Sequence, residues 1–223
     1  MKRARAGADE VVPGIIDAVI SGNLDGVKRA VARGESVDCK YECELNGRKG
    51  FASPLILAAV HNRVEICRYL VGRDADVRVS FSITGPTGLG EHALEGFGGA
   101  IVAAFYRPAA GVAANGMGGN ALHYAAEKGN AEILDVLLKE DNWSLFIDKQ
   151  NAESATPLHL AAYHGHEACV RALLKAGVDL DIATNREPKM TASDFAKAQG
   201  HRNIVRLIEA EREKRRDSGC VIA

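Results

Sequence analysis

The stretch Thr156-Pro-Leu-His-Leu-Ala-Ala-Tyr-His-Gly165 decides the fold, because its pattern occurs twice more along the chain. The other copies are Ser53-Pro-Leu-Ile-Leu-Ala-Ala-Val-His-Asn62 and Asn120-Ala-Leu-His-Tyr-Ala-Ala-Glu-Lys-Gly129. In each copy a residue that caps helices precedes a short apolar run, and a residue that tolerates a left-handed backbone closes it. The pattern therefore predicts a short helix in each copy, and its recurrence predicts a repeat architecture.

The residues that close these helices give the period of the repeat. They are Gly22, Asn62, Gly129, Gly165 and Gly200. Successive spacings are 40, 67, 36 and 35 residues, and the spacing of 67 is about twice the others. Halving it places one more unit around Gly96, where Thr87 and Leu89 stand at the expected offsets. We therefore expect six units, with the third degenerate.

A second helix is expected after each closing residue. Following Gly165, the apolar residues Val170, Leu173 and Leu174 recur at helical spacing, and the other units carry apolar residues at the same offsets. Each unit should thus be a helix-turn-helix followed by an extended loop, with these apolar positions in the core.

These phrases resemble the ankyrin repeat, whose period is near 33 residues and whose signature is Thr-Pro-Leu-His-x-Ala-Ala. The resemblance implies an all-α solenoid over residues 11–210, in which the first and last repeats are capping repeats and finger loops join neighbours. The expected repeats are 11–48, 49–84, 85–117, 118–152, 153–188 and 189–210. Residues 1–10 are expected to form a disordered basic tail, and residues 211–223 a flexible charged tail.

Composition and charge exclude several classes of protein. The 223 residues are 47% apolar and 26% charged, as in a soluble folded chain. A net charge of -1 gives no field that would gather polyanions, so we expect no nucleic-acid partner. The longest apolar run, Ala100 to Tyr106, is far shorter than the roughly 20 residues of a membrane-spanning helix. Met1 to Glu10 lacks the apolar segment of a secretory leader, which favours a cytoplasmic chain with free thiols. We also expect the chain to be a monomer.

Neither the histidines nor the cysteines predict catalysis or metal binding. By the resemblance, His123 and His159 occupy the signature position, where a histidine ties adjacent loops together. Cys39 and Cys43 lack a second Cys or His pair at a zinc-site distance. The Gly85-Pro-Thr-Gly-Leu-Gly90 stretch is only a weak match to a phosphate-binding loop. We expect no enzyme activity, no cofactor and no metal.

Two surfaces are candidates for binding a protein partner. By the resemblance, one is the concave groove, with His61, Tyr124, Glu127, Lys128, Tyr163 and His164 at its variable positions. The other is a lengthened finger between the first two units, which carries Tyr41, Arg48, Lys49 and Phe51. Tyrosines beside charges suit a protein contact, because tyrosine supplies apolar area and a polar tip.

The last four residues, Cys220-Val221-Ile222-Ala223, resemble a prenylation signal, and the terminal Ala favours farnesyl. This resemblance implies a prenyltransferase, and a prenyl-binding carrier, as partners. A single lipid gives reversible attachment, so we expect a cytoplasmic protein that exchanges with the cytoplasmic face of membranes. The nine residues from 209 to 217 sum to zero charge and add no second membrane signal.

Taken together, these features predict a non-enzymatic adaptor that is farnesylated at Cys220 and recruits or regulates a protein partner at a membrane surface. Two alternatives stay open. One is a soluble regulatory subunit or inhibitor of a partner enzyme, with the tail incidental. The other is a small enzyme in the Gly-rich third unit, for which no nucleophile, base and orienting group can be named.

Overall fold

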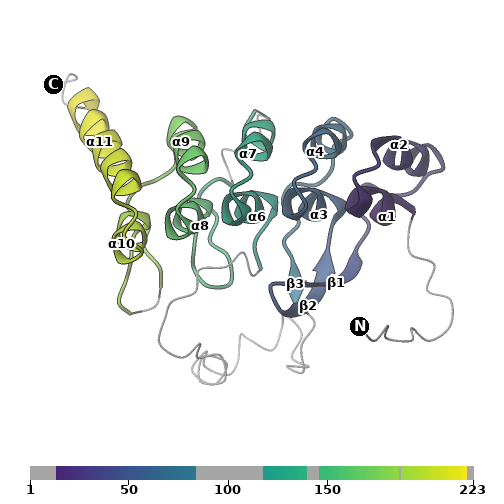
Figure 1. Cartoon of the computed structure of the whole chain (residues 1–223), viewed down its shortest axis with the longest axis horizontal. Helices are drawn as coiled ribbons and strands as arrows, with labels where there is room; N and C mark the ends of the chain where they lie inside the picture. The colour runs from purple at the N-terminus through teal and green to yellow at the C-terminus, as the bar shows by residue number, and fades with distance from the viewer. Residues whose placement is uncertain (1–13, 84–117, 140–145, 186, 220–223) are drawn as a thin grey trace.

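A computed structural model describes residues 14–83, 118–139, 146–185 and 187–219. Within these ranges, ten helices form five consecutive pairs that stack side by side in two layers (Figure 1). The inner helices are α1 (Gly14–Ser21), α3 (Pro54–Val60), α6 (Ala121–Lys128), α8 (Pro157–His164) and α10 (Ala192–Ala198). The outer helices are α2 (Leu24–Ala32), α4 (Val64–Val71), α7 (Ala131–Leu137), α9 (Glu167–Lys175) and α11 (Arg202–Gly219). The helical solenoid expected from the sequence is confirmed.

The repeated phrase forms a helix for the local reasons that its residues suggest. Thr156 caps α8 with its hydroxyl, and Pro157 occupies the first helical turn, where its missing N–H costs nothing. Gly165 ends the helix in the left-handed conformation, at φ 78°. Asn120 caps α6 in the same way, and Gly129 closes it at φ 76°.

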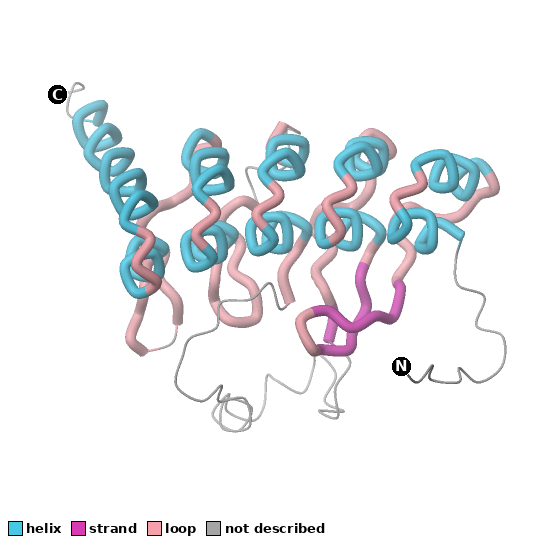
Figure 2. The backbone as a smooth tube through the Cα atoms, in the orientation of Figure 1, coloured by secondary structure: helices cyan, strands magenta, loops and turns pink. Residues whose placement is uncertain are grey.

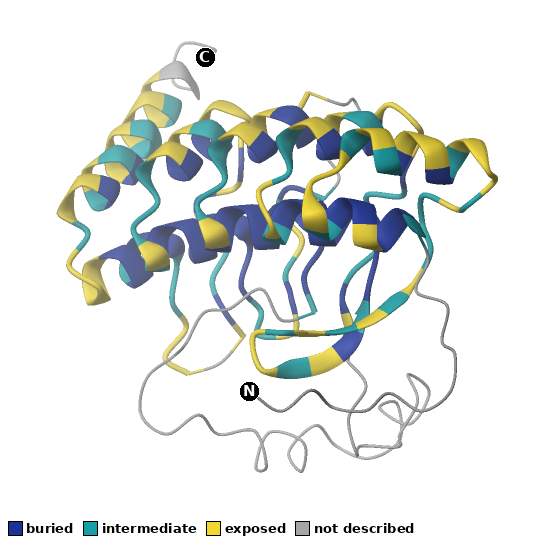
Figure 3. Cartoon of the chain, turned by 45° about the vertical axis from the view of Figure 1, so that its right-hand side comes forward, coloured by how far each residue is buried: buried dark blue, intermediate teal, exposed yellow. Residues whose placement is uncertain are grey.

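The core lies between the two layers, where apolar side chains of successive pairs meet. Figure 3 shows that the inner helices are buried on almost every side, whereas the outer helices are exposed on one face. Fully buried residues at the expected positions include Leu158, Ala161, Ala162, Val170 and Leu173. The small alanines of the inner helices let neighbouring helices approach closely. None of the helices in the described ranges has both the length and the apolar character needed to cross a bilayer.

A ladder of hydrogen bonds links each pair to the one before it. The donor is always the residue that follows the closing Gly or Asn of an inner helix, and the acceptor is a backbone carbonyl near the end of the preceding inner helix. The bonds are Arg63 Nη2 to Ile20 O at 2.8 Å, Asn130 Nδ2 to Ala59 O at 2.7 Å, His166 Nε2 to Glu127 O at 2.9 Å and His201 Nε2 to Tyr163 O at 3.1 Å. Carbonyls at helix ends lack an intrahelical partner, so this ladder satisfies them.

The structure corrects the expected number of repeats in the stack. Helix α3 packs directly against α6, and α4 against α7, so no helix pair stands between them. The Asn130 bond to Ala59 crosses the same interface. The expected third repeat, 85–117, lies outside the described residues. The described part of the stack has five helix pairs rather than six.

The long finger forms a small antiparallel sheet, which the expectation of an all-α chain did not include. The finger supplies β1 (Tyr41–Leu45) and β2 (Arg48–Ala52), and β3 (Ser82–Ile83) comes from the segment after α4. The strand order is β1-β2-β3, and Figure 2 shows the strands in magenta. Asn46 and Gly47 form the two-residue turn between β1 and β2, with φ of 51° and 75°. Asn-Gly is the favoured pair for such a turn, because both residues tolerate positive φ.

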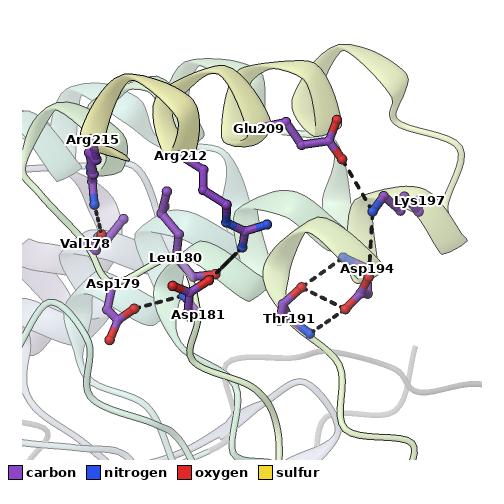
Figure 4. A network of polar contacts seen from close by, with 10 residues as sticks. All are labelled: Val178, Asp179, Leu180, Asp181, Thr191, Asp194, Lys197, Glu209, Arg212 and Arg215. Atoms are coloured by element: carbon purple, nitrogen blue, oxygen red, sulfur yellow. Dashed lines mark hydrogen bonds and ion pairs between the residues drawn. The ribbon is translucent and has the colours of Figure 1, made fainter. Parts of the chain in front are cut away.

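The C-terminal helix is longer than expected, which corrects the proposed flexible tail from residue 211. Helix α11 continues to Gly219 because two of its arginines dock on the preceding pair (Figure 4). Arg215 donates to the carbonyls of Val178 at 2.6 Å and Leu174 at 3.2 Å, near the C-terminal end of α9. Arg212 donates to Leu180 O and to Asp181.

Replacing Arg215 with Ala should therefore loosen the C-terminal end of the stack. Charge-assisted hydrogen bonds to backbone carbonyls are lost, so we expect the free energy of unfolding in urea to fall by about 1.5 to 3 kcal/mol. Arg216→Ala is the control, because Arg216 is exposed on the same helix, and its effect should stay below about 0.5 kcal/mol. Equal stabilities of the two variants would contradict the docking role.

Candidate functional site

The signature histidines are structural and connect each inner helix to the next finger. His159 Nδ1 accepts from the backbone N–H of Thr156 at 3.2 Å, and its Nε2 contacts the carbonyl of Met190 at 3.1 Å. His123 does the same with Asn120 and with the carbonyl of Lys149. For His159 these contacts require the neutral ring with its proton on Nε2. Burial lowers the pKa of both histidines to about 4, so both rings are neutral at neutral pH.

The groove prediction needs correction at two residues. Tyr124 is only 1% exposed and Glu127 only 7%, so neither side chain is available to a partner. Phe81, which precedes β3, packs edge-to-face on the Tyr124 ring with centroids 6.3 Å apart. The burial raises the pKa of the Tyr124 hydroxyl well above its usual range. The expected contact residue is therefore part of the core beneath the finger sheet.

The tip of the finger is fastened to the end of α6. Asn46 Nδ2 donates to both carboxylate oxygens of Glu127, at 2.9 and 3.0 Å. Lys128 Nζ donates to Asn46 Oδ1 at 3.1 Å and to Glu127 Oε1 at 2.9 Å. We call these three residues the clasp. It holds the hairpin across the inner helices, so the hairpin itself occupies part of the surface that was expected to bind a partner.

The strand β1 turns alternate side chains toward the core and toward solvent. Tyr41, Cys43 and Leu45 are half-buried and pack on the core. Glu42 and Glu44 are exposed, and the register sets Lys49 of β2 opposite Glu44 and Phe51 opposite Glu42.

The predicted finger residues therefore divide between the two faces of the hairpin. Lys49 lies exposed on the outer face with the half-buried Phe51, whereas Tyr41 faces inward. Arg48, next to the turn, is half-buried and has contacts of its own. Glu42 and Glu44 were missed by the sequence analysis, although the alternation of Tyr41-Glu-Cys-Glu-Leu45 is the signal of a half-buried strand.

The remaining predicted groove residues are accessible at the ends of the inner helices. His164 and His61 are exposed and Tyr163 is half-buried. The Tyr163 ring contacts His164 edge-to-face at 5.0 Å and Phe195 at 5.9 Å. Tyr163 is thus supported from below by a core phenylalanine. Burial, together with the charge of Arg63, lowers the pKa of His61.

The described cysteines do not form a reactive or metal-binding site. Burial raises the pKa of Cys67 and Cys169 to about 12, so both remain thiols. Burial also raises the pKa of the half-buried Cys39 and Cys43. In the ranges that the structure describes, no cluster of three or more His, Cys, Asp or Glu side chains could hold a metal ion. The Gly-rich stretch 85–90 and Cys220 to Ala223 lie outside those ranges.

Comparison with known sequences agrees with the geometry. The family described as ankyrin repeats (3 copies) matches residues 15–144, 92–184 and 144–217. Inversin of Canis lupus familiaris is 34% identical over 89 residues, 40% of this chain and 8% of inversin. The nuclear factor NF-kappa-B p105 subunit of Gallus gallus is 34% identical over 82 residues, 37% of this chain and 8% of that protein. Ankyrin repeat domain-containing protein 29 of Danio rerio is 40% identical over 63 residues, 28% of this chain and 20% of that protein. The matched part thus spans a fifth or less of each of these relatives.

The buried neutral histidines should make stability fall as the pH drops below neutrality. In the unfolded chain a histidine has a pKa near 6.5, whereas His123 and His159 have values of about 4 in the fold. Their contribution is therefore complete above about pH 6.5 and is lost between pH 6.5 and 4. The loss is about 1.4 kcal/mol per pH unit for each histidine.

Urea unfolding of His159→Gln at pH 6.5, 5.5 and 5 tests this linkage. Glutamine cannot titrate, so the stability of the variant should fall less steeply than that of the unmodified chain across this window. The absolute stability of the variant is not the readout, since the substitution also changes the packing beside Phe195. Identical slopes for the two proteins would contradict the assigned role of His159.

Proposed function

As a member of the ankyrin-repeat family, the chain is a protein-protein interaction module, and we propose that it binds its partner on two surfaces. The first is the open end of the groove around Tyr163 and His164. The second is the outer face of the finger, with Glu42, Glu44 and Lys49. The clasp joins the tip of the finger to the end of α6, the inner helix that packs against α8.

The observation that carries this proposal is the placement of Tyr163 on Phe195, with His164 exposed beside it. A tyrosine that is held by a buried ring loses little side-chain freedom when a partner covers it, so more of its contact energy remains for binding. Aromatic residues with a polar tip are also the ones that dominate protein interfaces. No catalytic arrangement is required for this function.

A photo-cross-linking amino acid at position 164 should form covalent adducts with the partner in cells that express the protein. The same probe at Arg171, on the exposed face of α9, is the matched control and should give no specific adduct. Replacement of Tyr163 by Ala should reduce the adduct yield at position 164 severalfold, because the anchor is lost. Equal adducts at positions 164 and 171 would contradict the groove assignment.

We also propose that Cys220 is farnesylated and that the lipid tethers the module reversibly to the cytoplasmic face of a membrane. Support comes from the sequence Cys220-Val221-Ile222-Ala223, and the proposal includes that Ala223 is the last residue of the translated protein. The Cys220 thiolate would displace diphosphate from farnesyl diphosphate and form a thioether. Because α11 extends to Gly219, the lipid would attach directly after the helix that closes the solenoid.

Expression in a prenylation-competent cell tests the tether. The modified chain should carry a farnesyl group and lack the three residues after Cys220, so its intact mass should be lower than that of the unmodified chain, because the lost residues weigh more than the added lipid. Part of the protein should sediment with membranes. Cys220→Ser should keep its unmodified mass and move to the supernatant. Single-chain anchoring is weak, so a mixed distribution of the unmodified sequence is expected. An equal membrane share for both proteins would remove support for the anchor.

A further inference from the structure

The finger sheet has an open edge in the part of the chain that the structure describes. The strand order is β1-β2-β3, so β1 is an outer strand whose single described neighbour is β2. Main-chain groups along an unpaired strand edge can pair with an extended segment of another chain. The orientation of the β1 backbone decides which residues offer those groups.

The turn fixes that orientation. Asn46 and Gly47 form a two-residue loop, so the flanking residues Leu45 and Arg48 are a hydrogen-bonded pair. Hydrogen-bonded and non-hydrogen-bonded residue pairs alternate along an antiparallel ladder. The main-chain N–H and C=O groups that bond to β2 are therefore those of Tyr41, Cys43 and Leu45. Glu42 and Glu44 turn their N–H and C=O groups toward the open edge. No described backbone group bonds to either of them across that edge.

The side chains of the same two residues give the edge a charge. The carboxylates of Glu42 and Glu44 are exposed, and neither forms an ion pair with another described residue. They lie two residues apart, so both project on the outer face of the sheet. An incoming strand would place alternate side chains beside them, and positive side chains at those positions would be complementary.

The edge is also held rigid. The clasp fixes the turn to α6, and a Cβ at Gly50 of β2 would strike the carbonyl of Ser82 and the ring of Phe81, so β2 and β3 are closely packed. A hairpin alone in water is marginally stable, whereas this one is packed on helices. The edge is therefore preformed, which reduces the ordering cost of adding a strand.

We propose that the free edge of β1 binds an extended segment of a partner protein that carries Lys or Arg at alternate positions. Main-chain hydrogen bonds at Glu42 and Glu44 would hold the segment as a fourth strand, and their carboxylates would select its charge. This inference deepens the proposed binding function by naming the kind of partner for the finger. A second copy of this chain is a poor occupant, because its own β1 would bring the same negative charges to the edge.

A synthetic capped peptide in which lysine alternates with valine serves as the probe, and the same peptide with glutamate in place of lysine is its control. We expect the lysine peptide to bind the full chain and to slow hydrogen exchange at the amides of Glu42 and Glu44. The glutamate peptide should leave both amides unchanged. Binding should weaken as salt is added, because the carboxylates are exposed.

Proline substitution separates the backbone contribution from the charge. Glu44→Pro removes an outward N–H and leaves the β1–β2 ladder intact, so we expect the affinity for the lysine peptide to fall about tenfold or more. Glu44→Gln should lower it only about two- to fivefold. Glu42→Pro is a second backbone variant. Slow exchange at Cys43 and Leu45 shows that each hairpin remains folded, and Glu132→Gln on α7 controls for the change in net charge.

Three results would overturn the inference. In the first, the lysine peptide gives no protection at Glu42 and Glu44, or Glu44→Pro and Glu44→Gln bind it equally. In the second, both amides exchange slowly without peptide and become fast when residues 1–12 are deleted, so the chain's own N-terminal segment fills the edge. In the third, sedimentation shows a dimer that Glu44→Pro abolishes. None of these results would change the expected photo-cross-linking at position 164. The proposal for the β1 edge can therefore be wrong while the groove around Tyr163 and His164 still binds a partner.

Discussion

Direct contact between neighbouring helix pairs is the constraint on which the rest of the structure depends. A pair of helices of seven to nine residues, such as α8 and α9, buries too little surface to be stable alone. Neighbouring inner helices therefore pack on one another through apolar side chains, α1 on α3, α3 on α6 and α6 on α8. The side chains after each turn satisfy the helix-end carbonyls. An end pair has only one neighbour, so the chain adds a long helix, α11, and docks it with Arg212 and Arg215.

The sequence alone predicted the features that depend on residues close together in the chain. Caps, closing glycines and the apolar offsets after Gly165 all depend on residues within one repeat, so they could be placed without knowing the neighbours. A sixth pair was inferred from the spacing of 67 residues, but a spacing only counts residues and does not say whether they add a pair to the stack. Thr87 and Leu89 matched the expected offsets, but α3 packs on α6. Residues 211–223 were expected to form a flexible charged tail, yet Arg212 and Arg215 donate to backbone carbonyls and hold the helix on the preceding pair.

The exposed binding residues could be predicted only where their exposure is set by their own repeat and not by a contact from a distant part of the chain. His61 and His164 are exposed as their repeat positions indicate, and the signature histidines bond as the resemblance implies. Glu127 occupies the position of Tyr163 but is buried, where Asn46 of the hairpin bonds to its carboxylate. Tyr124 instead stands at the position of Leu57 and Leu160, which are buried in their own repeats. The contact between Asn46 and Glu127 joins residues 81 positions apart, and no repeat pattern encodes a contact between one particular finger and one particular helix.

The hairpin changes the kind of recognition that this solenoid can perform. A uniform groove offers side chains at regular intervals, whereas the open edge of β1 offers main-chain donors and acceptors that recognise an extended shape. Its two carboxylates then select among extended segments by charge, and Tyr163 with His164 presents an aromatic surface two helix pairs away. Because the clasp and the stacked helices fix one surface relative to the other, a partner that occupies either surface is held at high local concentration beside the second. Moderate contacts at each surface are then sufficient for selective binding, provided that the partner carries both features at the matching separation.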